Sequence, residues 1–428
     1  MASAVPNEIL LIIFNAVTSP KPLPWPNAIY DRERAKAPFT LSRICQRWRR
    51  LARNRSSLWT YFGFTGDIAD AAVHAHLDRL KLLQALSKNH PLDIVFRWDL
   101  PLGSNAVRRN YRIQIVDALN KVGSRWRNVT LALNSALAPR LDVSMSGSSP
   151  ELETLSVRLL SETTYLPCAP RLQRLYVEAA GGNKGYNATT AYNRWPSLTS
   201  LATFTNDQTL HRATCATLRE LCILASLDRP KAASLVTLPL LTSLTLNDAE
   251  HLNAIDAPNL RSLTINCRAI YSVDSTSLTR FTAVVQHLGI FNSIEPSVVE
   301  YLAKFSIIES FTVEQPSMAR WRLGSPHFGV KSRAFAQLAA VEPPVWPKLQ
   351  HMRITDCYFN DLDIDAKGEG LFDFIHARTS VGGFPQEVDG PVQLRSIDID
   401  PKLPPSLYAR LRELGEKSSL LVRPIDRV

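Results

Sequence analysis

The sequence predicts an α/β protein in which an N-terminal helical module precedes an irregular solenoid, with parallel strands on its concave face and helices and loops on its convex face. Three observations predict this fold. Apolar residues recur at helical spacing over residues 5–62, a short strand-like pattern recurs over about 126–400, and most of the excess positive charge precedes that pattern. A chain of 428 residues is too long for one small domain.

The first predicted helix begins near Pro6, where a missing backbone N–H costs nothing, and Glu8 suits the positive end of the helix dipole. An unbroken apolar run, Ile9 to Phe14, follows, with Val17 one turn later. A helix that is apolar on all sides must be covered on all sides, and some sixty residues can hardly do this alone. We therefore expect part of this helix to face another chain.

A proline-rich stretch with Pro20, Pro22, Pro24 and Pro26 predicts an extended loop. A second helix is predicted from about Phe39 to Asn54, followed by an aromatic cluster around Trp59. Its apolar stripe consists of Leu41, Ile44, Cys45, Trp48, Leu51 and Ala52.

These residues resemble the F-box family. The matching segments are Val-Pro-Asn-Glu-Ile-Leu-Leu-Ile-Ile-Phe at 5–14, Leu-Ser-Arg-Ile-Cys-Gln-Arg-Trp-Arg-Arg-Leu-Ala at 41–52 and Ser-Leu-Trp at 57–59. Two departures are the long spacer 18–39 and Val5, where the family commonly has leucine. The resemblance implies binding to the Skp adaptor of an SCF ubiquitin ligase and, through it, to a cullin and a RING subunit.

The resemblance also implies a set of adaptor-binding residues. Those in or near the interface are Pro6, Ile9, Leu10, Ile13 and Phe14, and those in the core of the module or at its edge are Ile44, Trp48 and Trp59. The alternative is a small helical domain that packs only on the rest of its own chain.

The net charge of +10 is concentrated at the N-terminus, because residues 1–65 hold ten Lys or Arg and three Asp or Glu. Six arginines fall within residues 43–55, with no acidic residue among them. This placement predicts one acidic partner at the module, such as the Skp adaptor, and the alternative is a solvated arginine face. The remainder is near neutral, so we expect no nucleic-acid partner.

The recurring pattern is a large apolar residue, two spacers, an apolar residue, one spacer and an apolar residue. Its units begin at Trp126, Leu152, Leu172, Leu198, Leu218, Leu241, Leu260, Leu278, Ile308, Leu349 and Leu394. The early steps lie near the 20–29 residues of leucine-rich repeats, and the series resembles an irregular form of that family. Leu92 to Phe96 is a candidate further strand. The alternative is an ordinary α/β domain with apolar parallel strands.

The predicted organisation is a helical module at 1–65, a helical bridge and possible first repeat at 66–125, the repeat array at 126–400 and a cap at 401–428. Helices are predicted at 68–88, 104–120 and 406–416, and loops or insertions at 318–346 and 358–392.

Residues that could carry chemistry of their own are not arranged in a recognisable site. The series Asp361, Asp363, Asp365 starts like a calcium loop but has Ala366 where glycine is needed. His74 and His76 are two apart on a predicted helix and do not share a face. We expect no metal, no cofactor and no catalytic group. The six cysteines form no CxxC pair, which predicts reduced and mostly buried thiols.

No apolar run approaches the ~20 residues of a membrane span, and the first lacks the basic flank of a signal peptide. We therefore expect a cytoplasmic or nuclear protein with no membrane contact.

In a strand of this pattern, the residues that flank the inner apolar positions lie on the concave face. Tyr and Arg dominate interface energetics, so the candidate target contacts are Arg158, Arg174, Tyr176, Arg280 and Arg353. The alternative for each is a solvated position. The predicted function is the substrate-recognition subunit of an SCF-type ligase, and the alternative is a non-catalytic scaffold. The irregular array resembles F-box proteins of mushroom-forming fungi, which implies nothing about the target.

Overall fold

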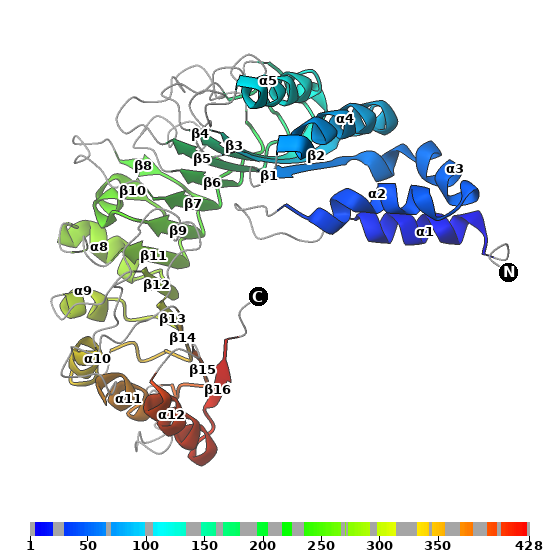
Figure 1. The fold of residues 1–428 in the computed structure, drawn as a ribbon. Coiled ribbons are helices and arrows are strands. Elements are labelled where there is room, and N and C mark those ends of the chain that lie inside the picture. Colours follow the sequence, from blue (N-terminus) through cyan, green and yellow to red (C-terminus); the bar gives the residue numbers. More distant parts are fainter. Residues whose placement is uncertain are drawn as a thin grey trace. The chain divides into compact units, whose positions relative to one another are not determined.

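The computed structural model describes residues 5–19, 30–65, 70–98, 106–133, 147–159, 166–179, 195–203, 216–224, 235–266, 270, 273–291, 298–313, 332–341, 345–355, 369–379, 392–399 and 404–425. The chain divides into two compact units, Met1–Thr217 and Leu218–Val428. Both units are α/β, and all the paired strands described in them run parallel (Figure 1).

The first unit begins with helices and continues with parallel strands that pair in chain order. Its helices are α1 (Asn7–Thr18), α2 (Arg32–Ile44), α3 (Gln46–Asn54), α4 (Asp70–Ser87) and α5 (Ala106–Asn120), with short 3-10 turns η1 (Ser56–Trp59) and η2 (Gly123–Arg125). Its strands are β1 (Tyr61–Thr65), β2 (Leu92–Trp98), β3 (Trp126–Leu133), β4 (Thr154–Leu159), β5 (Arg174–Ala179) and β6 (Ser200–Thr203).

At β1 and β2, helices α4 and α5 lie against one face of this sheet (Figure 1). On this face α4 and α5 pack on the alternate residues Phe62 and Phe64, and the Phe64 ring lies 5.0 Å from the His76 ring of α4. Successive strand residues point to opposite faces, so Tyr61 and Gly63 face the other way, toward α2. The helical module is therefore seated on a face of the sheet.

The second unit also builds a parallel sheet, with helices along one side of it (Figure 1). Its sheet strands are β7 (Glu220–Ile223), β9 (Ser243–Leu246), β11 (Ser262–Asn266), β12 (His287–Phe291), β13 (Ser310–Val313), β14 (His351–Ile354), β15 (Ser396–Ile399) and β16 (Leu421–Pro424). A separate pair is β8 (Val236–Thr237) with β10 (Ile255–Asp256). The helices are η5 (Ala249–Ala254), α8 (Ser275–Thr282), α9 (Val299–Ala303), α10 (Ser332–Ala339), α11 (Glu369–His376) and α12 (Pro405–Lys417).

The core of each unit is made of apolar rows that run across the strands in register. In the second unit one row is Leu244, Leu263, Leu288, Phe311, Met352 and Ile397. In the first unit an equivalent row is Ile94, Val129, Leu155, Leu175 and Leu201. Because every member is buried, each strand stabilises its two neighbours.

Ten of the eleven predicted repeat units contain a strand, and so does the segment after Pro91. The predicted repeat beginning at Leu278 is wrong, because Leu278 and the residues around it form the helix α8. Asp274 caps that helix by accepting a hydrogen bond from the Ser277 amide at 2.7 Å, and Leu278 and Phe281 lie one turn apart on its buried side. The strand comes later, at β12, where Leu288 and Ile290 lie on the buried row on either side of Gly289.

The helices at 68–88, 104–120 and 406–416 are confirmed as α4, α5 and α12. The single helix predicted at 39–54 is wrong in its limits. Asp31 caps α2, which starts at Arg32, and the chain is extended at Cys45 before α3 begins. The segments predicted as loops contain α10 and α11, and β1 and β16 were not predicted. The four prolines at 20–26 lie outside the described residues.

The rows predict that substitutions on the two faces of one strand differ sharply. Leu263→Ala should lower the free energy of unfolding by about 2–5 kcal/mol, because it removes a fully buried side chain. Its neighbour Ser262 is only half-buried, and Ser262→Ala should change the value by about 0.5 kcal/mol or less. Urea unfolding measures both, and equal effects would contradict the assigned faces.

Candidate functional site

Helix α1 has one buried side and one exposed side. Leu10 and Phe14 are 3% and 0% exposed, and the Phe14 ring packs on Trp48 at a centroid distance of 5.0 Å. The exposed aliphatic residues are Ile9, Ile12, Ile13 and Val17, with exposed fractions of 43–63%. They are three or four residues apart, so they form one stripe on the helix. We call these four residues the α1 apolar surface.

The start of α1 is fixed by an arginine from α3. Arg47 donates from Nε and Nη2 to the Asn7 side-chain oxygen at 3.0 and 2.8 Å, and from Nη2 to the Val5 carbonyl at 2.6 Å. These contacts join residues forty positions apart in the chain. The exposed stripe is therefore presented by a helix that is tied at its first turn.

Five exposed arginines belong to α2, α3 and the residue that follows α3. They are Arg43, Arg49, Arg50, Arg53 and Arg55, and we call them the arginine cluster. Among the described residues, none of the five is paired with a carboxylate. Unpaired surface cations at this density create a positive field that attracts acidic partners.

The structure divides the eight residues predicted to bind the adaptor. Pro6, Ile9, Ile13 and Ile44 are exposed, and Trp48 is half-buried. Leu10, Phe14 and Trp59 are buried, so they support the surface from beneath. The Trp59 indole donates to the Ala52 carbonyl at 2.8 Å and meets the Phe39 ring edge-on at 5.2 Å. Ile44 and Cys45 were predicted to belong to the apolar stripe of the second helix, but both side chains are exposed.

A buried ion-pair network joins the module to the sheet. Arg34 of α2 donates from Nη2 to the Asp93 carboxylate of β2 at 2.6 Å, and the two side chains are 7% and 4% exposed. The same guanidinium donates from Nε to the Thr18 carbonyl at 3.0 Å and lies 4.3 Å from the centroid of the Tyr61 ring. Arg34 therefore contacts the end of α1, β1 and β2 at once.

Asp93 has a second cation on its other side. Arg127 of β3 donates from Nε and Nη2 to its two oxygens at 3.0 and 2.9 Å, and the Asn128 amide donates at 2.9 Å. Burial raises the pKa of Asp93, but the hydrogen bonds and charges of Arg127 and Arg34 outweigh it and leave the pKa below its ordinary value. Removing one member of such a buried network costs about 3–5 kcal/mol.

Sequence reasoning missed this network. The available signal was Asp93 itself, an acidic residue within the otherwise apolar Leu92–Phe96 strand. A buried carboxylate in a strand requires a cation, but the sequence does not indicate which of the many arginines supplies it.

The predicted target contacts in the first unit lie on neighbouring strands, on the sheet face opposite the buried rows. Arg158 pairs with Glu178 at 3.2 Å, and the Tyr176 hydroxyl donates to the same carboxylate at 2.7 Å. Arg174 is exposed. Tyr176 is only 4% exposed, so the prediction that it offers an open contact is wrong. Its hydroxyl is instead used to hold Glu178.

In the second unit the corresponding face carries hydroxyl, amide and a few charged groups. Thr245, Thr264 and Arg353 lie on it, with Asp398 and Arg423 paired at 2.8 Å. Arg353 is exposed as predicted. Arg280 is not on this face, because α8 carries it among the helices, where it donates to the Ser277 hydroxyl at 2.9 Å.

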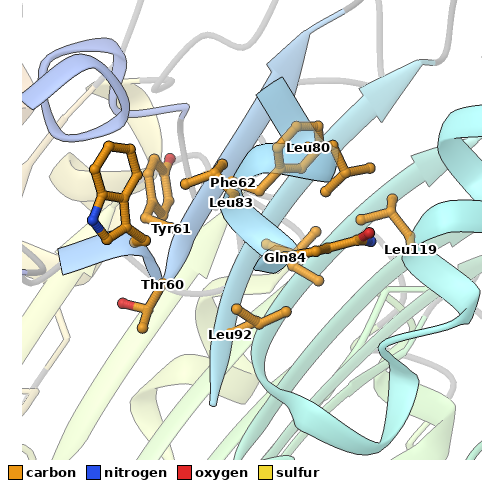
Figure 2. A pocket seen from close by; sticks show the side chains of 10 residues that line it. Thr60, Tyr61, Phe62, Leu80, Leu83, Gln84, Leu92 and Leu119 are labelled. Carbon is orange, nitrogen blue, oxygen red and sulfur yellow. The ribbon is translucent and has the colours of Figure 1, made fainter. Parts of the chain in front are cut away.

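A cavity of about 10 Å³ lies between β1, β2, α4 and α5, and its lining is apolar except for Thr60, Tyr61 and Gln84 (Figure 2). This is near the lower limit for one water molecule. Within the part of the chain that the structure describes, no three metal-ligating side chains gather. The calcium-like series at 361–365 lies outside that part.

Cys45 and Cys168 are free thiols, and Cys45 is exposed rather than buried. Among the described helices, none has the length and apolar character to cross a membrane. Comparison with models of protein families and with curated proteins gave no match to this chain. The functional interpretation therefore depends on the surfaces themselves.

The two sides of α1 predict opposite responses to truncation. Phe14→Ala should lower the free energy of unfolding by about 3–5 kcal/mol, because it empties a fully buried site. The exposed Ile13→Ala should change it by about 0.5 kcal/mol or less. Chemical denaturation followed by tryptophan fluorescence measures the difference. A large loss with Ile13→Ala would show that this side of the helix is already covered within the chain.

Proposed function

We propose that this chain is the substrate-recognition subunit of an SCF-type ubiquitin ligase, with the N-terminal module binding the Skp adaptor and exposed residues on the polar face of the strands binding a target protein. The observation that carries the proposal is the α1 apolar surface, together with the F-box-like residues that produce it. The helix is folded and anchored, yet four aliphatic side chains remain in water.

The α1 apolar surface is large enough to drive association. Burying a fully exposed aliphatic side chain stabilises a complex by about 1.5–3 kcal/mol before the costs of association, and these four side chains, which are about half exposed, would each contribute about half of that. Four such side chains on one stripe match the groove-binding mode of an amphipathic helix. The arginine cluster adds charge complementarity to an acidic partner. The resemblance to the F-box family implies such a partner, because the Skp adaptor is an acidic protein.

The role of the rest of the chain follows from this attachment. Exposed residues on the polar faces of the sheets hold a target, and the adaptor brings it close to a conjugating enzyme that carries ubiquitin. Transfer is then accelerated by effective concentration and orientation, with no reactive group supplied by this chain. Arg158, Arg174 and Arg353 lie on the polar strand faces and are the candidate target contacts.

The adaptor assignment predicts loss of binding when the α1 apolar surface is charged. Ile9→Asp with Ile13→Asp should abolish capture of the purified Skp adaptor, because two carboxylates would have to be desolvated in an apolar contact. Leu235→Asp with Leu240→Asp is the matched control, since these side chains are equally exposed in the second unit. Retained capture by the first variant would refute the assignment. In a separate co-purification experiment, a complex that contains the adaptor but lacks the cullin would favour the scaffold alternative.

The arginine cluster predicts a rate effect. Replacing Arg49, Arg50 and Arg53 with glutamine should slow association with the Skp adaptor and weaken its dependence on salt, because exposed charges act mainly through steering. Dissociation should change little. Arg171→Gln, an exposed arginine paired with Glu151, is the control. Stopped-flow measurements at several ionic strengths test this, and an unchanged salt dependence would exclude electrostatic steering by the cluster.

A further inference from the structure

The N-terminal module is held on the sheet by contacts of unusual specificity. The Tyr30 ring lies so close to Gly63 that a Cβ there would be 2.1 Å from a ring carbon. Beside it, Ala35, Tyr61 and Val95 pack together with the Tyr30 ring. Tyr30, two residues before α2, can pack on β1 at this distance only because residue 63 has no side chain. This contact fixes where the chain that enters α2 meets the strand.

Polar contacts add direction to this apolar fit. The Tyr61 hydroxyl accepts a hydrogen bond from the Asp31 amide at 2.9 Å, next to the cap of α2. Arg34 reaches Thr18, Tyr61 and Asp93 from a single guanidinium. A rotation of the module on the sheet would break these contacts together, whereas apolar contacts alone would tolerate sliding.

The network is asymmetric. The Asp93 carboxylate accepts from Arg34 of α2 on one side and from Arg127 and Asn128 of β3 on the other. If the module moved away, the carboxylate would keep Arg127, but Arg34 would lose its buried carboxylate. The buried charge of Arg34 therefore ties the seating of the helices to a single arrangement.

We propose that Arg34 and Asp93 are positioning residues that hold the N-terminal module in one fixed orientation on the sheet of the first unit. Resting on the function proposed above, this fixes the direction in which a bound adaptor faces relative to a target on the strands β4 and β5. The sheet and the module then act as one rigid arm, and the lysines that ubiquitin can reach are set by this junction.

The orientation can be measured on the whole chain without any partner. Donor and acceptor dyes are attached through unnatural amino acids at the exposed positions Asn54 in α3 and Gln173 before β5. Single-molecule energy transfer should give one narrow distance distribution for the parent chain. Arg34→Met keeps an apolar stem but removes the guanidinium, and it should cause loss of that single narrow distribution.

Two further variants separate orientation from folding. Arg171→Met removes an equally short but exposed ion pair, 2.6 Å to Glu151, and should leave the distribution unchanged. Hydrogen exchange should show β4 and β5 still protected in Arg34→Met, while amides of α2 exchange about 100-fold faster. A narrow, unshifted distribution in a folded Arg34→Met protein would overturn the proposal. If Arg34→Met unfolds, the same energy-transfer measurement on Arg34→Lys tests the proposal. We expect a broader distance distribution, because lysine cannot contact Thr18, Tyr61 and Asp93 at once.

The effect of the junction on ubiquitin transfer is tested by a separate measurement. In a complex reconstituted with saturating Skp adaptor, cullin, RING subunit and charged conjugating enzyme, Arg34→Met should shift ubiquitin to different lysines of this chain. An unchanged set of modified lysines would overturn this part. If the parent chain itself does not bind the adaptor, the proposed function fails, and the energy-transfer result still decides the fixed orientation.

Discussion

The burial of one guanidinium organises the N-terminal half of this protein. Arg34 is withdrawn from water, and its charge is compensated by Asp93, the Thr18 carbonyl and the face of the Tyr61 ring. These partners belong to β2, α1 and β1, so satisfying the one cation brings three elements to one point. An unsatisfied buried charge would cost more than most apolar contacts supply, which makes this arrangement the constraint that the others follow.

The arrangement explains why part of α1 is left uncovered. With α2 seated on the sheet and Phe14 packed on Trp48, the helix has a covered side and a free side. The same side chains that would be a liability in an isolated protein become a binding surface when an acidic, groove-bearing partner is present. The proposed adaptor role therefore follows from the packing of the module as well as from its resemblance to the F-box.

Much of the fold could be predicted because the repeat is local. The repeat units that contain Leu244 and Leu263 each predict a strand, and the pairing of these strands in register follows from their shared apolar face. The prediction failed at Leu278, where the same spacing fits a capped helix. The sequence could not show that Ile9 is exposed and Leu10 buried, because both lie in an unbroken apolar run. It also could not indicate the Arg34–Asp93 contact, because the two residues are 59 positions apart and meet only through the packing of distant elements.

Whether the α1 apolar surface binds a protein partner can be measured by isothermal titration calorimetry of the whole chain with the purified Skp adaptor, repeated at several temperatures. We expect one-to-one binding at micromolar concentration or tighter, with a clearly negative heat-capacity change from apolar burial. Absence of binding at these concentrations, or binding whose enthalpy does not vary with temperature, would contradict this expectation.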